Sequence, residues 1–184
     1  MSYASDLLVE EHEIIERMIA VLNKAADKLE RGDRVDPQLF LEAVDFIRNF
    51  ADRCHHAKEE DILFKLMAER GFPIQGGPVG VMLTEHEYAR KYNEAMEKAT
   101  KELLQGNIQA KNSIIENARN YARLLTEHIH KENNILYPMG NRIFSSEDQN
   151  LLKEKFEEVE KNEIGEGVHQ RYLKLVEKLE KDII

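Results

Sequence analysis

Two segments of the chain, 73 residues apart, repeat the same order of histidine, glutamate and apolar residues. The first contains His55 and Glu59, the second contains His128 and Glu132, and isoleucine, leucine and an aromatic residue follow each pair. Residues four apart lie on one face of an α-helix, so each segment directs an imidazole and a carboxylate the same way. This duplication predicts a helical bundle that presents ligands to metal ions in its core.

The repeat extends to a third position in each half of the chain. His12 and His86 occupy matching Glu-His-Glu triplets, and the glycine- and proline-rich segment 71–78 separates the two copies. In each half, the two histidines lie 19 or 20 residues on either side of a predicted turn. At about 1.5 Å per residue, antiparallel helices joined at that turn carry both histidines to one level. Pairing the halves predicts a bundle in which four histidines and two glutamates meet in one layer.

Caps, breaks and apolar periodicity predict four bundle helices. The first begins at Ser5 or Asp6, either of which can cap it, and ends before Gly32. The other three are expected over about residues 36–66, 78–105 and 108–137. Pro138 and Gly140 should end the fourth helix, because proline lacks the backbone donor and glycine favours helix ends.

Residues 1–140 are therefore predicted to form an all-α, up-down-up-down four-helix bundle. Residues 141–184 carry two further amphipathic helices, the first with a capping signal at Ser145. We expect them to form a C-terminal helical extension that packs on the bundle. Pairing of these helices with a second chain is the alternative.

Composition and charge exclude several other classes of protein. Charged residues make up 33% of the chain and hydrophobic residues 42%, which is typical of a soluble helical protein and not of a disordered one. The net charge is -9 and no basic patch occurs, which argues against nucleic acid as a partner. No apolar run reaches the ~20 residues that a membrane span needs.

Cysteine usage and the N-terminal residues predict a cytoplasmic protein. The one cysteine, Cys54, cannot form an internal disulfide, which suits a reducing compartment. Residues 1–13 lack the basic start and apolar core of a secretory signal, so we expect none. Cys54 itself is expected to be a buried apolar residue, with a metal or redox role beside His55 as the alternative.

The predicted polar layer is chemically suited to a pair of metal ions. Its six residues are His12, His55, Glu59, His86, His128 and Glu132. Buried carboxylates are costly without a cation, and imidazole and carboxylate without thiolate suit iron, manganese or zinc. Six ligands are too many for one tetrahedral zinc, whereas two ions can each take two histidines and share both carboxylates. That division leaves room for an oxo or hydroxo bridge, and redox-active iron is the expected occupant.

The order of these residues resembles the hemerythrin-like (HHE cation-binding) family over roughly residues 5–140. The resemblance implies a four-helix bundle around a non-haem di-iron centre. The two irons would be bound by His12 with His55 and by His86 with His128, and bridged by Glu59 and Glu132. A competing register replaces His55 and Glu59 by His56 and Glu60.

Two positions depart from the oxygen-carrying hemerythrins of this family. Those proteins have a second histidine one turn after the third-helix histidine, and an aspartate five residues after the fourth-helix histidine. Arg90 and Asn133 occupy these positions here, so the five-histidine carrier set is not expected. Four histidines with two glutamates instead resemble the iron centre of nitric-oxide-responsive iron–sulfur cluster repair proteins. Those proteins carry a cysteine-bearing N-terminal segment, and no cysteine precedes the motif here, so we expect a stand-alone di-iron protein.

The resemblance implies a protein that reacts with O2, peroxide or nitric oxide, in stress protection, sensing or iron handling. The alternatives are reversible O2 binding or storage, iron donation in cluster repair, and a helical interaction module whose polar layer is only structural. The expected partners are a small diatomic or peroxide ligand and an electron donor that the sequence does not identify. The chain is expected to be a monomer or homodimer, and its residue pattern does not decide whether any reaction is catalytic.

Other residues have weaker claims to the site. Glu166 and His169 have the Glu-x-x-His spacing of ferritin-type bundles, but they follow a glycine-broken segment. A surface or packing role is expected for them, with an additional iron ligand as the alternative. Tyr88, Tyr92 and Tyr121 lie on helices near the layer, and one of them is expected to hydrogen-bond a ligand.

Overall fold

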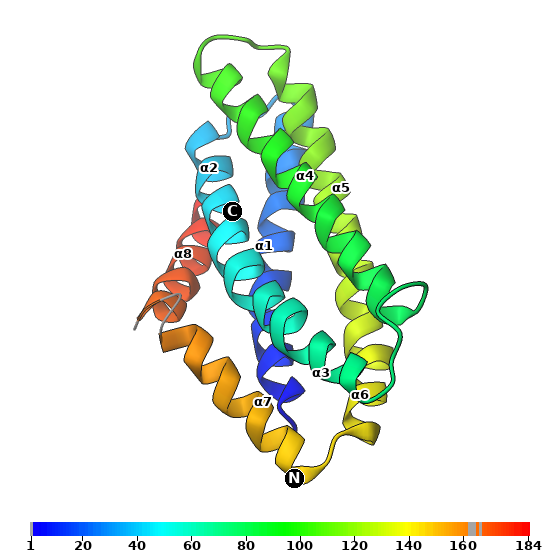
Figure 1. The fold of residues 1–184 in the computed structure, drawn as a ribbon. Coiled ribbons are helices and arrows are strands. Elements are labelled where there is room, and N and C mark those ends of the chain that lie inside the picture. Colours follow the sequence, from blue (N-terminus) through cyan, green and yellow to red (C-terminus); the bar gives the residue numbers. More distant parts are fainter. Residues whose placement is uncertain (1, 162–164, 166) are drawn as a thin grey trace.

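The computed structural model describes residues 2–161, 165 and 167–184, and these residues form helices and no strand (Figure 1). Four antiparallel helical rods make up the bundle. They are formed in order by α1 (Ser5–Glu30); by α2 (Pro37–Phe46), η1 (Ile47–His56), η2 (Glu59–Leu63) and α3 (Phe64–Glu69); by α4 (Pro78–Leu104); and by α5 (Ala110–Lys131), η3 (Glu132–Leu136) and α6 (Tyr137–Ile143). Two C-terminal helices follow, α7 (Ser146–Val159) and α8 (Val168–Asp182). The predicted all-α, up-down-up-down bundle with additional C-terminal helices is confirmed.

Two of the predicted helix starts have the expected caps. The Asp36 carboxylate accepts a hydrogen bond from the backbone N–H of Gln38 at 2.9 Å, and Pro37 occupies the first turn of α2. Ser145 and Asp148 form a reciprocal capping box at the start of α7. Each cap satisfies backbone donors that the first helical turn leaves free, which fixes where the chain enters the helix.

Two other helix boundaries differ from the expected ones. Helix α1 begins at Ser5, but neither Ser5 nor Asp6 caps it. The fourth rod does not stop at Pro138 and Gly140, because α6 runs on to Ile143. Pro138 lies in the first turn of α6, directly after the wide turns of η3, and the rod continues past it.

Three π-helical stretches, η1, η2 and η3, interrupt the second and fourth rods. They coincide with the two His-x-x-x-Glu segments: η1 ends at His56, η2 begins at Glu59 and η3 begins at Glu132. A π-helix bonds each N–H to the carbonyl five residues earlier, so its turns are wider than those of an α-helix. Such stretches are frequent at functional sites, and here they mark the same level in two rods.

The apolar core is divided into two clusters with a polar layer between them. On α1, Leu8 belongs to the smaller cluster, Ile15 belongs to the larger one, and His12 lies between them. Helix α7 contributes Phe156 to the smaller cluster and α8 contributes Val176 to the larger one, along one side of the bundle (Figure 1). The C-terminal helices therefore bury apolar side chains against the bundle. None of the described helices is both long and apolar enough for a membrane crossing.

Candidate metal centre

The six residues predicted for the polar layer all lie together in the core. Each is at most 1% exposed. Together with His56, they offer potential ligand atoms in two sets, and the atoms within each set lie within 4.8 Å of one another. One set is His12, His55, Glu59 and Glu132, and the other is His56, Glu59, His86 and His128. That these side chains hold metal ions remains a prediction.

His56 joins the layer, although the sequence offered it only in a competing register. Its side chain is 2% exposed and lies beside His86, with ring centroids 3.8 Å apart. Glu60, its partner in that register, does not join, because its carboxylate accepts from His86 Nδ1 on the outer side at 2.6 Å. Adjacent side chains on an α-helix diverge by about 100°. The wider π-helical turns of η1 reduce that angle, so His55 and His56 both reach the layer.

Each of the five histidines is held from outside by an oxygen acceptor on its Nδ1 atom. The pairs are His12 with Asn133 at 2.8 Å, His55 with Glu11 at 2.9 Å, His56 with Asp52 at 3.3 Å, His86 with Glu60 at 2.6 Å and His128 with Glu85 at 2.8 Å. A carboxylate or amide oxygen only accepts, so Nδ1 carries the proton. The Nε2 atoms are thereby left facing the layer, as in metal sites where an outer partner fixes the imidazole.

Three cations lie behind the outer carboxylates. Lys58 contacts Glu11 at 2.5 Å, and Lys131 contacts Glu85. Arg90 bonds Asp52 and Glu60 at 2.7 Å each. Arg90, which replaces a ligand histidine of the oxygen carriers, thus anchors both carboxylates that orient His56 and His86.

These outer contacts follow the sequence repeat. Glu11 precedes His12 but serves His55 across the hairpin, and Glu85 likewise precedes His86 but serves His128. The anchoring lysines are also equivalent, because each lies three residues after the histidine that it supports. Both outer carboxylates, Glu11 and Glu85, lie in the repeated Glu-His-Glu triplets, but the sequence did not predict that they would bind His55 and His128.

The two glutamates of the layer lie between the two sets of histidines. Glu132 Oε2 is 3.2 Å from His12 Nε2, and its Oε1 is 3.0 Å from His128 Nε2. Glu59 Oε2 is 3.7 Å from His55 Nε2 and 3.4 Å from His86 Nε2. Each carboxylate thus spans a histidine of one set and a histidine of the other, an arrangement suited to bridging.

Tyr137 is the tyrosine that reaches the layer. Its hydroxyl donates to Glu59 Oε1 at 2.6 Å. Burial and the nearby carboxylates raise its pKa well above the ordinary value, so it remains a donor. Of the tyrosines proposed from sequence, Tyr88 is half exposed and Tyr92 packs against the larger apolar cluster. Tyr121 is buried, and none of the described residues hydrogen-bonds its hydroxyl. Tyr137 was missed, although it is the aromatic residue that ends the second repeated segment.

When the histidines are neutral, several buried atoms of the layer have no hydrogen-bond partner within the described part of the chain. They are His55 Nε2, His56 Nε2, Glu59 Oε2 and both carboxylate oxygens of Glu132. In addition, the Nε2 atoms of His86 and His128 face each other at 3.0 Å. An unsatisfied buried polar atom costs about 1–3 kcal/mol, and more when charged. Cations bound among these atoms would satisfy them, so the donor set fits the metal pair that the family implies.

Charge balance in the described part of the site points the same way. The six carboxylates of the layer and its outer partners face three cations, a surplus of three negative charges when the histidines are neutral. Burial lowers the pKa of His128, but its interactions with Glu132, Glu85 and Glu59 together outweigh burial and raise the pKa to about 10. Burial, and then repulsion from His86, hold the pKa of His56 well below its usual value. Bound metal would take the place of the protons that otherwise balance the carboxylates.

Two further residues singled out from sequence, Cys54 and His169, lie outside both sets. Cys54 is buried, with Sγ 3.8 Å from Glu11 Oε1, and burial raises its pKa to about 12, which makes the thiol unreactive. His169 packs against the ring of Phe50, with centroids 5.0 Å apart. Glu166 lies outside the described residues.

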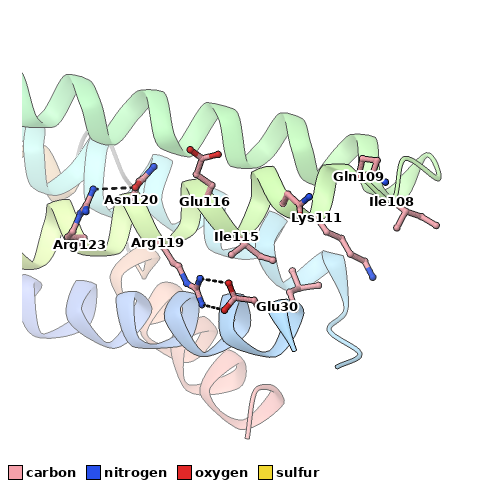
Figure 2. Close-up of a pocket in the computed structure, with 11 residues that line it drawn as sticks. Glu30, Ile108, Gln109, Lys111, Ile115, Glu116, Arg119, Asn120 and Arg123 are labelled. Atoms are coloured by element: carbon pink, nitrogen blue, oxygen red, sulfur yellow. Dashed lines mark hydrogen bonds and ion pairs between the residues drawn. The ribbon is translucent and has the colours of Figure 1, made fainter. Parts of the chain in front are cut away.

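A separate surface groove lies far from the layer, between the end of α1 and the start of α5 (Figure 2). Glu30, Ile108 and Arg119 are among the residues that line it, and no histidine or cysteine does. The Arg119 guanidinium is already paired with Glu30 at 2.7 Å. We therefore assign this groove no part in metal binding.

Comparison with known proteins gives matches of two kinds. Residues 3–140 match the model of the hemerythrin HHE cation binding domain. Uncharacterized proteins of Mycobacterium tuberculosis and Mycobacterium bovis are 22% identical over 180 residues, which is 98% of this chain and 70% of theirs. The iron–sulfur cluster repair protein YtfE of Yersinia pseudotuberculosis is 34% identical over 91 residues, which is 48% of this chain and 41% of that protein. No solved structure matches.

Proposed function

Because this chain belongs to the family of hemerythrin HHE cation-binding domains, we propose that its polar layer holds two iron ions in a non-haem di-iron centre. The observation that carries the proposal is the group of buried imidazole and carboxylate atoms for which the described residues offer no hydrogen-bond partner. One ion would be held by His12 and His55, and the other by His56, His86 and His128. Glu59 and Glu132 would bridge them.

Iron is the proposed metal because of the donor types and the protein around them. Imidazole and carboxylate without thiolate suit iron, manganese or zinc, and a shared pair of carboxylates suits two adjacent ions. When bound, two iron ions would exchange electrons with O2, peroxide or nitric oxide. The apolar clusters above and below exclude bulk water, and the Tyr137 hydroxyl holds Glu59 in place. We propose that this chemistry serves stress protection, sensing or iron handling.

Two other functions each have one observation in their favour. Reversible O2 binding is favoured by His56, which adds a fifth histidine to the site. His56 lies on the second rod, whereas the oxygen carriers have their additional histidine on the third helix, at the position of Arg90. Iron donation in cluster repair is favoured by the likeness to YtfE, which covers 41% of that protein. The proposed reaction with O2, peroxide or nitric oxide is compatible with both of these observations, so it is the function to test first.

The test is an anaerobic titration of metal-free protein with ferrous iron, followed by optical spectra during exposure to O2 and its removal. We expect two irons per chain and irreversible oxidation by O2, with peroxide or nitric oxide as further oxidants to compare. A coloured species that forms and disappears with O2 would favour reversible binding instead. Fewer than one iron per chain would overturn the metal centre itself.

A further inference from the structure

The side chain of Lys58 links the candidate metal centre to the C-terminal helices. Lys58 is 0% exposed, and its ammonium lies between Glu11 Oε1 at 2.5 Å and Glu160 Oε1 at 2.6 Å. Glu160 directly follows α7 and is beyond residues 3–140, the part that matches the family. A residue outside the matched domain therefore reaches an ion pair inside it.

The contact continues from Lys58 to the metal layer. Glu11 uses one oxygen for Lys58 and the other for His55 Nδ1, at 2.9 Å. The orientation of the Glu11 carboxylate thus depends on both neighbours. Glu160, Lys58, Glu11 and His55 form one connected series from the surface of the protein to a candidate ligand.

The second half of the chain offers an internal comparison. Lys131 is the repeat equivalent of Lys58, and it anchors Glu85, which supports His128. Lys131 is 32% exposed, and among the described residues its ammonium forms an ion pair with Glu85 and none with α7 or α8. Water can solvate its ammonium, whereas a fully buried ammonium needs protein acceptors. At the anchoring lysine, the two halves therefore differ in the carboxylate that the C-terminal extension supplies to Lys58.

We propose that Glu160 is a positioning residue for the metal ion held by His55, an inference that rests on the proposed two-metal centre. Glu160 shares the Lys58 ammonium, so Glu11 can keep its second oxygen on His55. Without the contact from Glu160, the Lys58 ammonium attracts both oxygens of Glu11, and the hydrogen bond between Glu11 and His55 weakens. The ion at His12 and His55 is then retained less well, while the ion at His86 and His128 is unaffected.

The test compares the full-length protein with its Glu160→Gln variant, both loaded anaerobically with ferrous iron. A coloured ferrous chelator then reports the rate at which each iron is released. We expect one of the two irons to leave about threefold to tenfold faster, less than the effect of removing a direct outer partner of a ligand. Glu157→Gln is the matched control, because this exposed carboxylate on α7 pairs with Lys161 at 3.5 Å and, among the described residues, with no residue of the site. This variant should release iron like the wild type.

A second variant tests whether Glu160 acts through Glu11. Glu11→Gln alone should release the same iron about 10- to 100-fold faster. Adding Glu160→Gln to that variant should then change nothing further, and multiplied effects would overturn the proposed route. The inference would also be overturned if Glu160→Gln released both irons faster, or if it released iron at the wild-type rate. In either case, two irons bound per wild-type chain would leave the proposed function intact. Fewer than one iron per wild-type chain would remove the proposed function and this inference together.

Discussion

Replacing Glu132 by glutamine should remove most of the stability that iron adds to this protein. Glu132 is completely buried, and its two oxygens lie near one histidine of each set. Glutamine keeps the shape of the side chain but loses its charge and its ability to bridge. A ligand that binds only the folded state stabilises it by RT ln(1 + [L]/Kd), about 2.7 kcal/mol for each site at a free concentration of 100 Kd. Two sites would then add about 5 kcal/mol.

The loss in the Glu132→Gln variant follows from the same relation. If the substitution raises both dissociation constants about 100-fold, each site adds only about 0.4 kcal/mol at the same free iron concentration. For a chain of this size, 1 kcal/mol corresponds to about 2–4 °C in Tm. The wild type should therefore gain about 10–20 °C on loading with ferrous iron, and the variant about 2–3 °C. Differential scanning calorimetry under anaerobic conditions, with and without iron, measures both increments.

The iron-dependent increment decides the question, not the absolute Tm. In metal-free protein the variant also breaks the buried pairs with His128 and His12, and such a loss costs about 3–5 kcal/mol. Glu127→Gln, at an exposed position on α5, is the control and should keep the full increment. An unchanged increment and two irons per chain in Glu132→Gln would refute its role as a ligand. No increment in the wild type would instead favour a polar layer that is only structural.

Three further results are expected. His56→Gln should weaken one of the two irons at least about tenfold, whereas the exposed His130→Gln should bind iron like the wild type, as judged by chelator competition. Arg90→Gln should weaken the same iron about 10- to 100-fold, because Arg90 anchors two outer carboxylates; equal weakening of both irons would contradict this. Hydrogen bonding to Arg70 lowers the pKa of Asp148 below its ordinary value of 3.8. The ionised Asp148 carboxylate therefore stabilises the fold above pH 3.8. The stability difference between wild type and Asp148→Asn in urea should therefore be full at pH 6 and shrink as the pH falls below 3.8 through the folded-state pKa.

The fold and the members of the polar layer could be predicted because both depend on periodicity. Apolar spacing located the four rods, and the matched distances from His12 and His55 to their turn placed them at one level. His56 could not be assigned in the same way. Its orientation depends on the π-helical turns of η1, and a pattern with the α-helical period gives no sign of them. Pro138 was misread for a related reason, since η3 allows the helix to continue past it.

The residues that bind the histidine Nδ1 atoms occupy repeated positions in the sequence. Their partners could be recognised only from the packing of the helices. The residue after each glutamate of the layer orients the first histidine of the other half: Glu60 holds His86, and Asn133 holds His12. These contacts join residues that are distant in sequence, so helical periodicity within one segment does not reveal them. The same applies to Glu160, whose contact with Lys58 spans 102 positions.

The repeat also shows where the two halves of the site differ. His56 has Ile129 as its repeat equivalent, and the charged Glu60 has the neutral Asn133. One set therefore has three histidines, all with carboxylate partners, and the other has two histidines, of which His12 is held by an amide. A carboxylate partner makes an imidazole a stronger donor than an amide does, because it stabilises positive charge on the ring. The ion at the three-histidine set should thus be held more tightly. His56→Gln should speed release of this iron and Glu160→Gln release of the other, so iron release from the two variants tests the inequality.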